Sequence, residues 1–226
     1  MTTIEFEPKI FQAPSYITLA GPSGSAKTTL ALALIHYKNE LFTQHMAGTV
    51  YFYSEMQPAF KRTDLGVIYF HRGMPTAQEV DTYIDKFNGA CFLMCFDDLS
   101  HEIGNSDLVT SLATKKSHHK NFVCLNITQN LYSQGSQART QSLNSHYFLL
   151  TRSTRDIRQI GVLGSQMQPG RGSKRLLEIY QDAVDNPLST DFPPHLLIAC
   201  HPFTDRGCQL LTNVLPPEGV KILYRM

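Results

Sequence analysis

The sequence predicts an α/β domain with a mostly parallel sheet and helices on both faces. Short, largely apolar segments such as 91–96 and 122–127 alternate along the chain with longer segments of helical periodicity. Strands of this kind are typical of parallel sheets, whose connecting helices bury both faces. The 226 residues, 42% hydrophobic and 17% charged, suffice for one globular domain with a full core.

The elements expected from periodicity and turn residues follow in chain order. Thr76, with Glu79 three residues later, has the sequence of a capping box and predicts the start of a helix. The expected strands are 16–20, 48–54, 67–70, 91–96, 122–129, 146–151, 195–200, 209–214 and 220–224, the last closing an edge of the sheet. The expected helices are 28–36, 76–87, 107–117, 156–168 and 174–184. Because no linker divides the chain, we expect a single domain from 15 to 226 after an N-terminal extension at 1–14.

A phosphate-binding loop is predicted between the first of these strands and the first helix. Residues 21–29 read GPSGSAKTT and match G-x-x-x-x-G-K-[ST], the Walker A pattern, at all but one position. A strand, a tight turn and a helix N-terminus place backbone N–H groups and the helix dipole around an anion. Lys27 is expected to reach the β- and γ-phosphates of ATP, and the Thr28 hydroxyl to hold Mg²⁺. The residues expected to contact the nucleotide are Gly21, Pro22, Ser23, Gly24, Ser25, Ala26, Lys27, Thr28 and Thr29.

Ala26 departs from this pattern, because it stands where the second glycine is expected. Glycine tolerates a positive φ, which costs alanine roughly 1–2 kcal/mol. We therefore expect Ala26 to have a negative φ within a loop that still wraps around phosphate.

Acidic and amide side chains at the ends of later strands complete the predicted site. Asp97 and Asp98 follow an apolar strand and so lie at the carboxyl edge of the sheet, where the phosphates bind. Asp97 is expected to hold Mg²⁺ through water and Asp98 to polarise the attacking water (a Walker B arrangement). Gln129 ends the next long strand. Two interpretations of Gln129 remain open: contact with the γ-phosphate or its water, and a capping amide in a turn.

Arginines are needed as well, because hydrolysis develops negative charge on the γ-phosphate. Such an arginine can come from the same chain or from a neighbouring subunit. Arg139, in a polar stretch ten residues beyond Gln129, could reach a neighbouring subunit's phosphate, and Arg152 and Arg155, just past the next strand, are the alternatives. From 139 to 175 the chain has seven basic residues and one acid, a local charge of +6 in a protein of net charge +1. This stretch fits DNA binding, phosphate-binding arginines or a solvated face.

Composition argues against several other classes of protein. The longest apolar run, 90–96, is too short to cross a membrane, and the acidic N-terminal segment lacks the apolar core of a secretory signal. Five cysteines, an odd number, fit reduced core thiols better than a disulfide framework. Cys200, His201 and Cys208 offer only a weak zinc pattern.

The order of these motifs resembles the DNA-packaging ATPases of the FtsK/HerA superfamily, found in double-stranded DNA viruses and Polinton/Maverick-type elements. The resemblance runs from about residue 15 to the C-terminus, with the poxvirus packaging ATPase as a more distant relative. The motifs that carry it are the loop at 21–28, Asp97-Asp98, ITQNL at 127–131, ART at 138–140 and SLNSHY at 142–147.

This resemblance implies a RecA-like core in which the strand ending at Gln129 lies between the loop strand and the Asp97 strand. It also implies a homo-oligomeric ring with ATP at subunit interfaces and Arg139 acting in trans. The activity implied is pumping of double-stranded viral DNA into a capsid, with capsid vertex proteins as partners and the host nucleus or cytoplasm as location. A nucleoside or nucleotide kinase, and a nucleotide-binding assembly module without turnover, are the alternatives.

Overall fold

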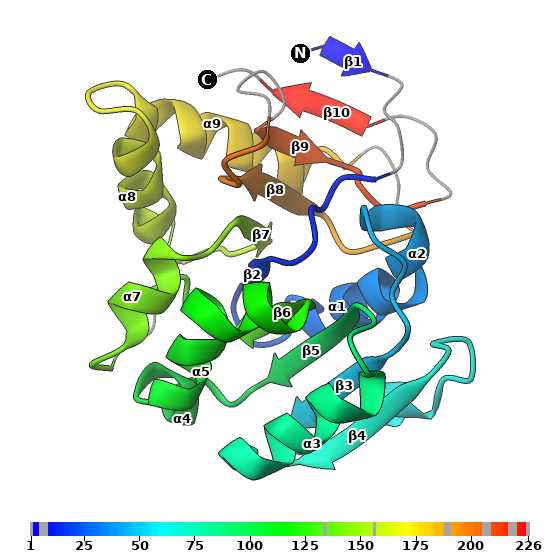
Figure 1. Ribbon diagram of the computed structural model, residues 1–226. Coiled ribbons are helices and arrows are strands. Elements are labelled where there is room, and N and C mark those ends of the chain that lie inside the picture. The colour runs from blue at the N-terminus through cyan, green and yellow to red at the C-terminus, as the bar shows by residue number, and fades with distance from the viewer. Residues whose placement is uncertain are drawn as a thin grey trace.

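The computed structural model describes residues 2–4, 9–132, 135–155, 157–187, 191–204, 209–216 and 221–224. They form a ten-stranded sheet with helices on both faces (Figure 1). The strands are β1 (Thr2–Ile4), β2 (Tyr16–Ala20), β3 (Thr49–Tyr53), β4 (Ile68–Arg72), β5 (Phe92–Asp97), β6 (Phe122–Thr128), β7 (Tyr147–Thr151), β8 (His195–Ala199), β9 (Leu210–Thr212) and β10 (Lys221–Tyr224).

The helices include several short ones that periodicity did not predict. The main helices are α1 (Lys27–His36), α3 (Ala77–Phe87), α8 (Arg158–Met167) and α9 (Gly172–Asp185). The shorter ones are α2 (Lys38–Leu41), η1 (Pro58–Lys61), α4 (Ser100–Gly104), α5 (Asp107–Ser111), η2 (Leu112–Lys116), α6 (Ser117–Lys120) and α7 (Ala138–Leu143). The single helix expected at 107–117 is α5 and α6 joined by the π-helical turn η2. The capping box of α3 is present as predicted, since Thr76 and Glu79 bond reciprocally.

The strand order is β1-β10-β9-β8-β7-β2-β6-β5-β3-β4. The strands from β7 to β4 pair in parallel, and the strands on the other side of β7 pair antiparallel. The predicted α/β class with a mostly parallel sheet is therefore confirmed. β6, which precedes Gln129, lies between β2 and β5, as the resemblance implied.

The edge of the sheet differs from the prediction. The expectation that 220–224 closes the edge is wrong, because β1 pairs antiparallel with β10 on its outer side, with Thr3 opposite Ile222. Phe11 is also fully buried, between Phe42 and Tyr147. The N-terminal segment therefore adds an edge strand and a core aromatic, which its lack of periodicity did not reveal.

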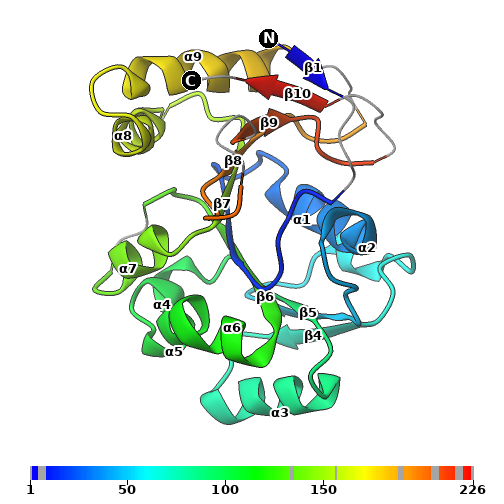
Figure 2. The same cartoon turned by 45° about the horizontal axis from the view of Figure 1, so that its top comes forward.

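Side-chain alternation along β2 shows how the two faces of the sheet are covered. Ile17 and Leu19 belong to the core beneath α1, whereas Tyr16 and Ala20 point to the opposite face. That opposite face has two parts, one packed under α8 and α9 and one under α3, α5 and η2. Figures 1 and 2 show α1 and α2 together, apart from α3, α5 and α6. Because β2, β6 and β5 are parallel neighbours, their carboxyl ends form one edge, where the predicted site residues meet.

Candidate active site

The loop joins β2 to α1, as predicted, but its backbone differs from the prediction at one position. Ala26 has φ 61° and ψ 31°, a left-handed conformation, so the expectation of a negative φ is wrong. Gly24 also has a positive φ, of 79°. The Ala26 carbonyl accepts the first α-helical hydrogen bond, from Leu30 N at 3.0 Å. The turn into α1 thus requires the left-handed conformation at residue 26, whichever residue occupies it. The cost for alanine is about 1–2 kcal/mol.

Lys27 bridges the loop from its first helical position. Its Nζ donates to Pro22 O at 2.9 Å, and Ser25 Oγ donates to the same carbonyl at 2.8 Å. Burial lowers the pKa of Lys27, and the charges of Asp97 and Asp98 oppose that shift. The amine therefore lies inside the loop, where it can bind an anion held by the backbone N–H groups.

Asp97 is held by two hydroxyl groups. Its Oδ2 accepts from Thr28 Oγ1 at 3.0 Å and from Tyr51 OH at 2.7 Å, and the residue is 4% exposed. Burial raises the pKa of Asp97, while the bonds from Tyr51 and Thr28 oppose that rise. Oxygen ligands of this kind suit Mg²⁺, so the Thr28–Asp97 pair fits the predicted metal-binding role.

Tyr51 was not predicted as a site residue. It lies on β3, which pairs with β5, and its side chain reaches the carboxylate from the neighbouring strand. The sequence does not indicate that Tyr51 contacts Asp97, because that contact depends on β3 and β5 being neighbours in the sheet.

Asp98 and Gln129 meet at the adjoining strand ends. Asp98 has φ 56°, and its Oδ1 accepts from Gln129 Nε2 at 3.1 Å. Together with Asp97 they line a polar pocket of about 260 Å³. The remaining lining residues are Ser23, Gly24, Ala26, Lys27, Thr28, Thr29, Gln57 and Ile127. The structure thus brings the loop, the two acids and the glutamine into one cavity, and Gln57 is an addition that the sequence did not indicate.

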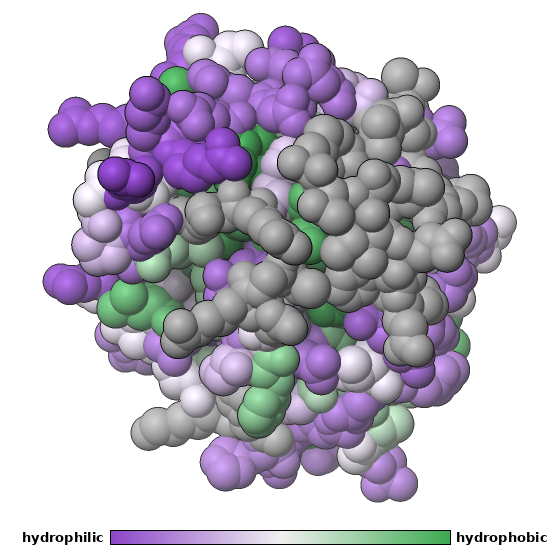
Figure 3. Space-filling view, turned by 90° about the horizontal axis from the view of Figure 1, so that it is seen from above, coloured by the Kyte–Doolittle hydropathy of each residue, from purple (hydrophilic) through white to green (hydrophobic). Residues whose placement is uncertain are grey.

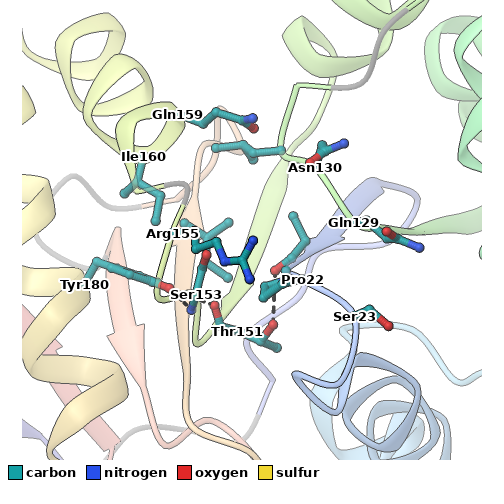
Figure 4. Close-up of a pocket in the computed structure, with 14 residues that line it drawn as sticks. Pro22, Ser23, Gln129, Asn130, Thr151, Ser153, Arg155, Gln159, Ile160 and Tyr180 are labelled. Carbon is teal, nitrogen blue, oxygen red and sulfur yellow. Dashed lines mark hydrogen bonds between the residues drawn. The ribbon is translucent and has the colours of Figure 1, made fainter.

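A second pocket, of about 190 Å³, lies beside the same loop (Figure 4). Gly21 and Pro22 border it, and Ser23 and Gln129 border both pockets. Ser25, the remaining loop residue, bonds to Thr151 at the end of β7 (Oγ–Oγ1, 2.7 Å). The loop is therefore enclosed by β6 and β7 as well as by α1.

The three candidate arginines lie in different places. Arg139 is exposed on α7 and lines a separate groove with Leu143 and Val162, away from both pockets beside the loop. Arg152 pairs with Asp185 at 3.0 Å. Arg155 lines the second pocket, and its side chain extends towards the loop at Pro22 (Figure 4). The role of Arg139 in trans stays a prediction.

Other predicted features of the chain concern metals and membranes. Cys208 lies outside the described residues, so the structure does not test the weak zinc pattern that it forms with Cys200 and His201. Among the described residues, no three His, Cys, Asp or Glu side chains cluster as a metal site would require. Within the same ranges, no helix has the length and apolar character needed to span a bilayer.

Solved structures with this fold include a viral genome-packaging NTPase. The chain is similar to B204 of Sulfolobus turreted icosahedral virus 2 in complex with ATPγS, with a TM-score of 0.50 and 9% identity over 98% of this chain and 100% of that one. It is also similar to B204, the DNA-packaging ATPase of Sulfolobus turreted icosahedral virus, with a TM-score of 0.51 and 9% identity over 94% and 98% of the two chains. No family model and no curated protein sequence matches the chain. At this identity the likeness establishes the fold, which is that of a P-loop NTPase.

Proposed function

We propose that this protein hydrolyses ATP to drive double-stranded DNA into a viral capsid, as a member of the FtsK/HerA superfamily. The observation that carries the proposal is the single cavity that joins the phosphate loop, Thr28–Asp97 and Asp98–Gln129. B204, a viral genome-packaging NTPase solved in complex with ATPγS, supports the proposal, because it shares the fold over nearly the whole chain.

The roles of the chain's residues follow from their positions. Loop N–H groups and Lys27 bind the phosphates, and Thr28 and Asp97 would hold Mg²⁺, which supplies charge neutralisation when bound. Asp98 accepts a proton from the attacking water, whose oxygen forms a bond to the γ-phosphorus. The bond from that phosphorus to the β–γ bridging oxygen breaks, and ADP leaves with the electron pair. Gln129, bonded to Asp98, is placed to orient the water beside it.

Assembly and partners belong to the same proposal. A homo-oligomeric ring would place Arg139, exposed on α7, against the nucleotide of a neighbouring subunit. Double-stranded DNA would pass through that ring, and capsid vertex proteins would anchor it. The protein would then act where virions assemble, in the host nucleus or cytoplasm.

ATP hydrolysis by the purified protein, with and without double-stranded DNA, tests this function. We expect DNA to raise the rate, Lys27→Ala to abolish hydrolysis, and Lys61→Ala, an exposed lysine on η1, to leave it unchanged. A cooperative rise of specific activity with protein concentration would support the ring. Transfer of phosphate to an added nucleoside would favour a kinase instead, and tight ATP binding without turnover, even with DNA, would favour an assembly module.

A further inference from the structure

The loop between β7 and α8 is fixed against the phosphate loop by hydrogen bonds. Tyr180 OH on α9 donates to Thr151 O at 2.9 Å and accepts from Ser153 N at 2.7 Å. Thr151 Oγ1 lies 2.7 Å from Ser25 Oγ and 3.3 Å from Ala20 O, so this hydroxyl contacts both residues. These contacts join Thr151, at the end of β7, to Ala20 just before the phosphate loop and to Ser25 within it. The backbone at Ser153, two residues before Arg155, is therefore anchored beside the phosphate loop.

Arg155 lies in the same loop. It lines the pocket bordered by Gly21, Pro22 and Gln129, and Figure 4 shows its guanidinium extended towards Pro22 rather than back towards α9. No hydrogen bond or ion pair among the described residues involves Arg155, whereas Arg152 in the same loop is paired with Asp185. The guanidinium of Arg155 therefore retains its donors for a ligand.

The charge of the site shows what such a ligand would be. Among the described residues that line the two pockets, the charged ones are Lys27 and Arg155, which are basic, and Asp97 and Asp98, which are acidic. Without Arg155, Lys27 and the Mg²⁺ that Thr28 and Asp97 would hold are the cations that face the two carboxylates and the several negative charges of a triphosphate. Ser23 and Gln129 border both pockets, so a γ-phosphate beside Gln129 and Asp98 would lie at their junction. Planar guanidinium donors match phosphate oxygens at such a position.

We propose that Arg155 binds the γ-phosphate of the nucleotide held by its own chain and stabilises the charge that develops on it during hydrolysis. This inference rests on the proposed ATP hydrolysis and adds a cation in cis to any arginine supplied by a neighbouring subunit. Arg155 donates N–H groups to the γ-phosphate oxygens from the second pocket, on the side of the loop bordered by Pro22. Lys27 binds the phosphates from within the loop. The second pocket is the space through which the arginine reaches the phosphate.

Single-residue variants test the contact. Arg155→Ala should lower kcat about 1,000-fold, the loss typical of an arginine that stabilises phosphoryl transfer. The same variant should weaken binding of ATPγS and leave binding of ADP unchanged, because only the γ-phosphate is contacted. Arg155→Lys should recover little of the rate, since lysine lacks the planar pair of donors. Arg152→Ala, from the same loop, is the matched control and should behave like the wild type.

Mixing experiments separate action in cis from action in trans. Arg155→Ala and Lys27→Ala chains carrying different tags are mixed, and co-purification verifies that they assemble together. An arginine acting in cis gives no recovery of hydrolysis, because neither chain then has a complete site. Recovery, or an Arg155→Ala variant that matches Arg152→Ala, would overturn the inference. A wild-type protein that fails to bind ATP would instead refute the proposed function, so the two failures are distinguishable.

Discussion

At the scale of single residues, Ala26 shows how a loop can impose a backbone conformation on a residue that disfavours it. We expected a negative φ at Ala26 because alanine disfavours a positive φ. The structure gives it φ 61°, because the chain must turn there into α1. The loop nevertheless borders a cavity of about 260 Å³ with Lys27, Thr28 and Asp97. The penalty of about 1–2 kcal/mol is a cost in folding stability, and the cavity still forms beside the loop.

The first prediction concerns Tyr51, which donates to the same oxygen of Asp97, Oδ2, as Thr28 does. Tyr51→Phe removes a hydrogen bond to a buried charged group that is expected to hold Mg²⁺. Loss of such a supporting contact typically costs about 10-fold or more in metal affinity or activity. We expect the Mg²⁺ concentration at half-maximal ATP hydrolysis to rise about 10-fold, with a smaller change in the rate at saturating Mg²⁺.

Tyr53→Phe provides the matched control for this measurement. Tyr53 lies on the same strand and packs on Phe60 and Phe70. Its substitution should leave the Mg²⁺ dependence unchanged. An unchanged Mg²⁺ requirement in Tyr51→Phe would show that this hydroxyl does not support the metal-binding carboxylate.

At the scale of elements, periodicity and capping predicted most long segments but missed the short ones. α4 and α7 have only five and six residues, which is too short for a helical repeat to be recognised. β1 was missed for a related reason, since three residues carry no alternation and depend on β10 for their pairing. Segments of this length form through tertiary contacts, which a single sequence does not display.

The α8–α9 pair carries the second prediction, because its backbones pack closely through glycines. A Cβ at Gly164 would overlap the carbonyl of Gly172, which is backbone and cannot rotate away. A Cβ at Gly161 would meet Ser173 Oγ at 2.8 Å, a side chain that can rotate. We therefore expect Gly164→Ala to lower the free energy of unfolding by about 1–3 kcal/mol, the usual cost of overpacking.

Urea denaturation followed by circular dichroism measures this difference. Gly161→Ala should be at least about 1 kcal/mol more stable than Gly164→Ala, since alanine is favoured within a helix where space allows. Equal stabilities of the two variants would show that the helices can separate to accept either methyl group.

At the scale of the whole molecule, the active site depends on a strand order that the motifs alone do not specify. Asp97, Asp98 and Gln129 were predicted as site residues from their places at strand ends. Their meeting with the loop requires β6 to lie between β2 and β5, which came from the resemblance rather than from periodicity. Tyr51, Gln57 and the anchored loop of Arg155 depend on pairings across the sheet and between layers. For that reason the sequence did not indicate Tyr51 or Gln57, and it named Arg155 as a candidate arginine without showing how its loop is anchored.

Three residues of the basic stretch at 139–175 lie together on the surface of the fold. Arg171, Lys174 and Arg175 are exposed where α8 turns into α9, and the Lys174 side chain is 89% exposed. Glu178 is the acid that lies near Lys174 and Arg175. Seen from above, strongly hydrophilic side chains gather on the left, the side where α8 and α9 meet (Figure 3). This cluster is the surface that we expect to contact DNA phosphates.

Replacing these three residues with glutamine is the third prediction. Because each phosphate contact releases condensed counterions, losing three contacts should reduce the slope of log affinity against log salt by about 3. DNA stimulation of ATP hydrolysis should fall with it, while hydrolysis without DNA stays at the wild-type rate, since these side chains line neither pocket beside the phosphate loop. Glutamine at Lys9, Lys61 and Lys120, exposed elsewhere, removes the same charge and serves as the control. If both triple variants lose DNA stimulation equally, total charge governs DNA binding and the α8–α9 cluster is not the contact surface.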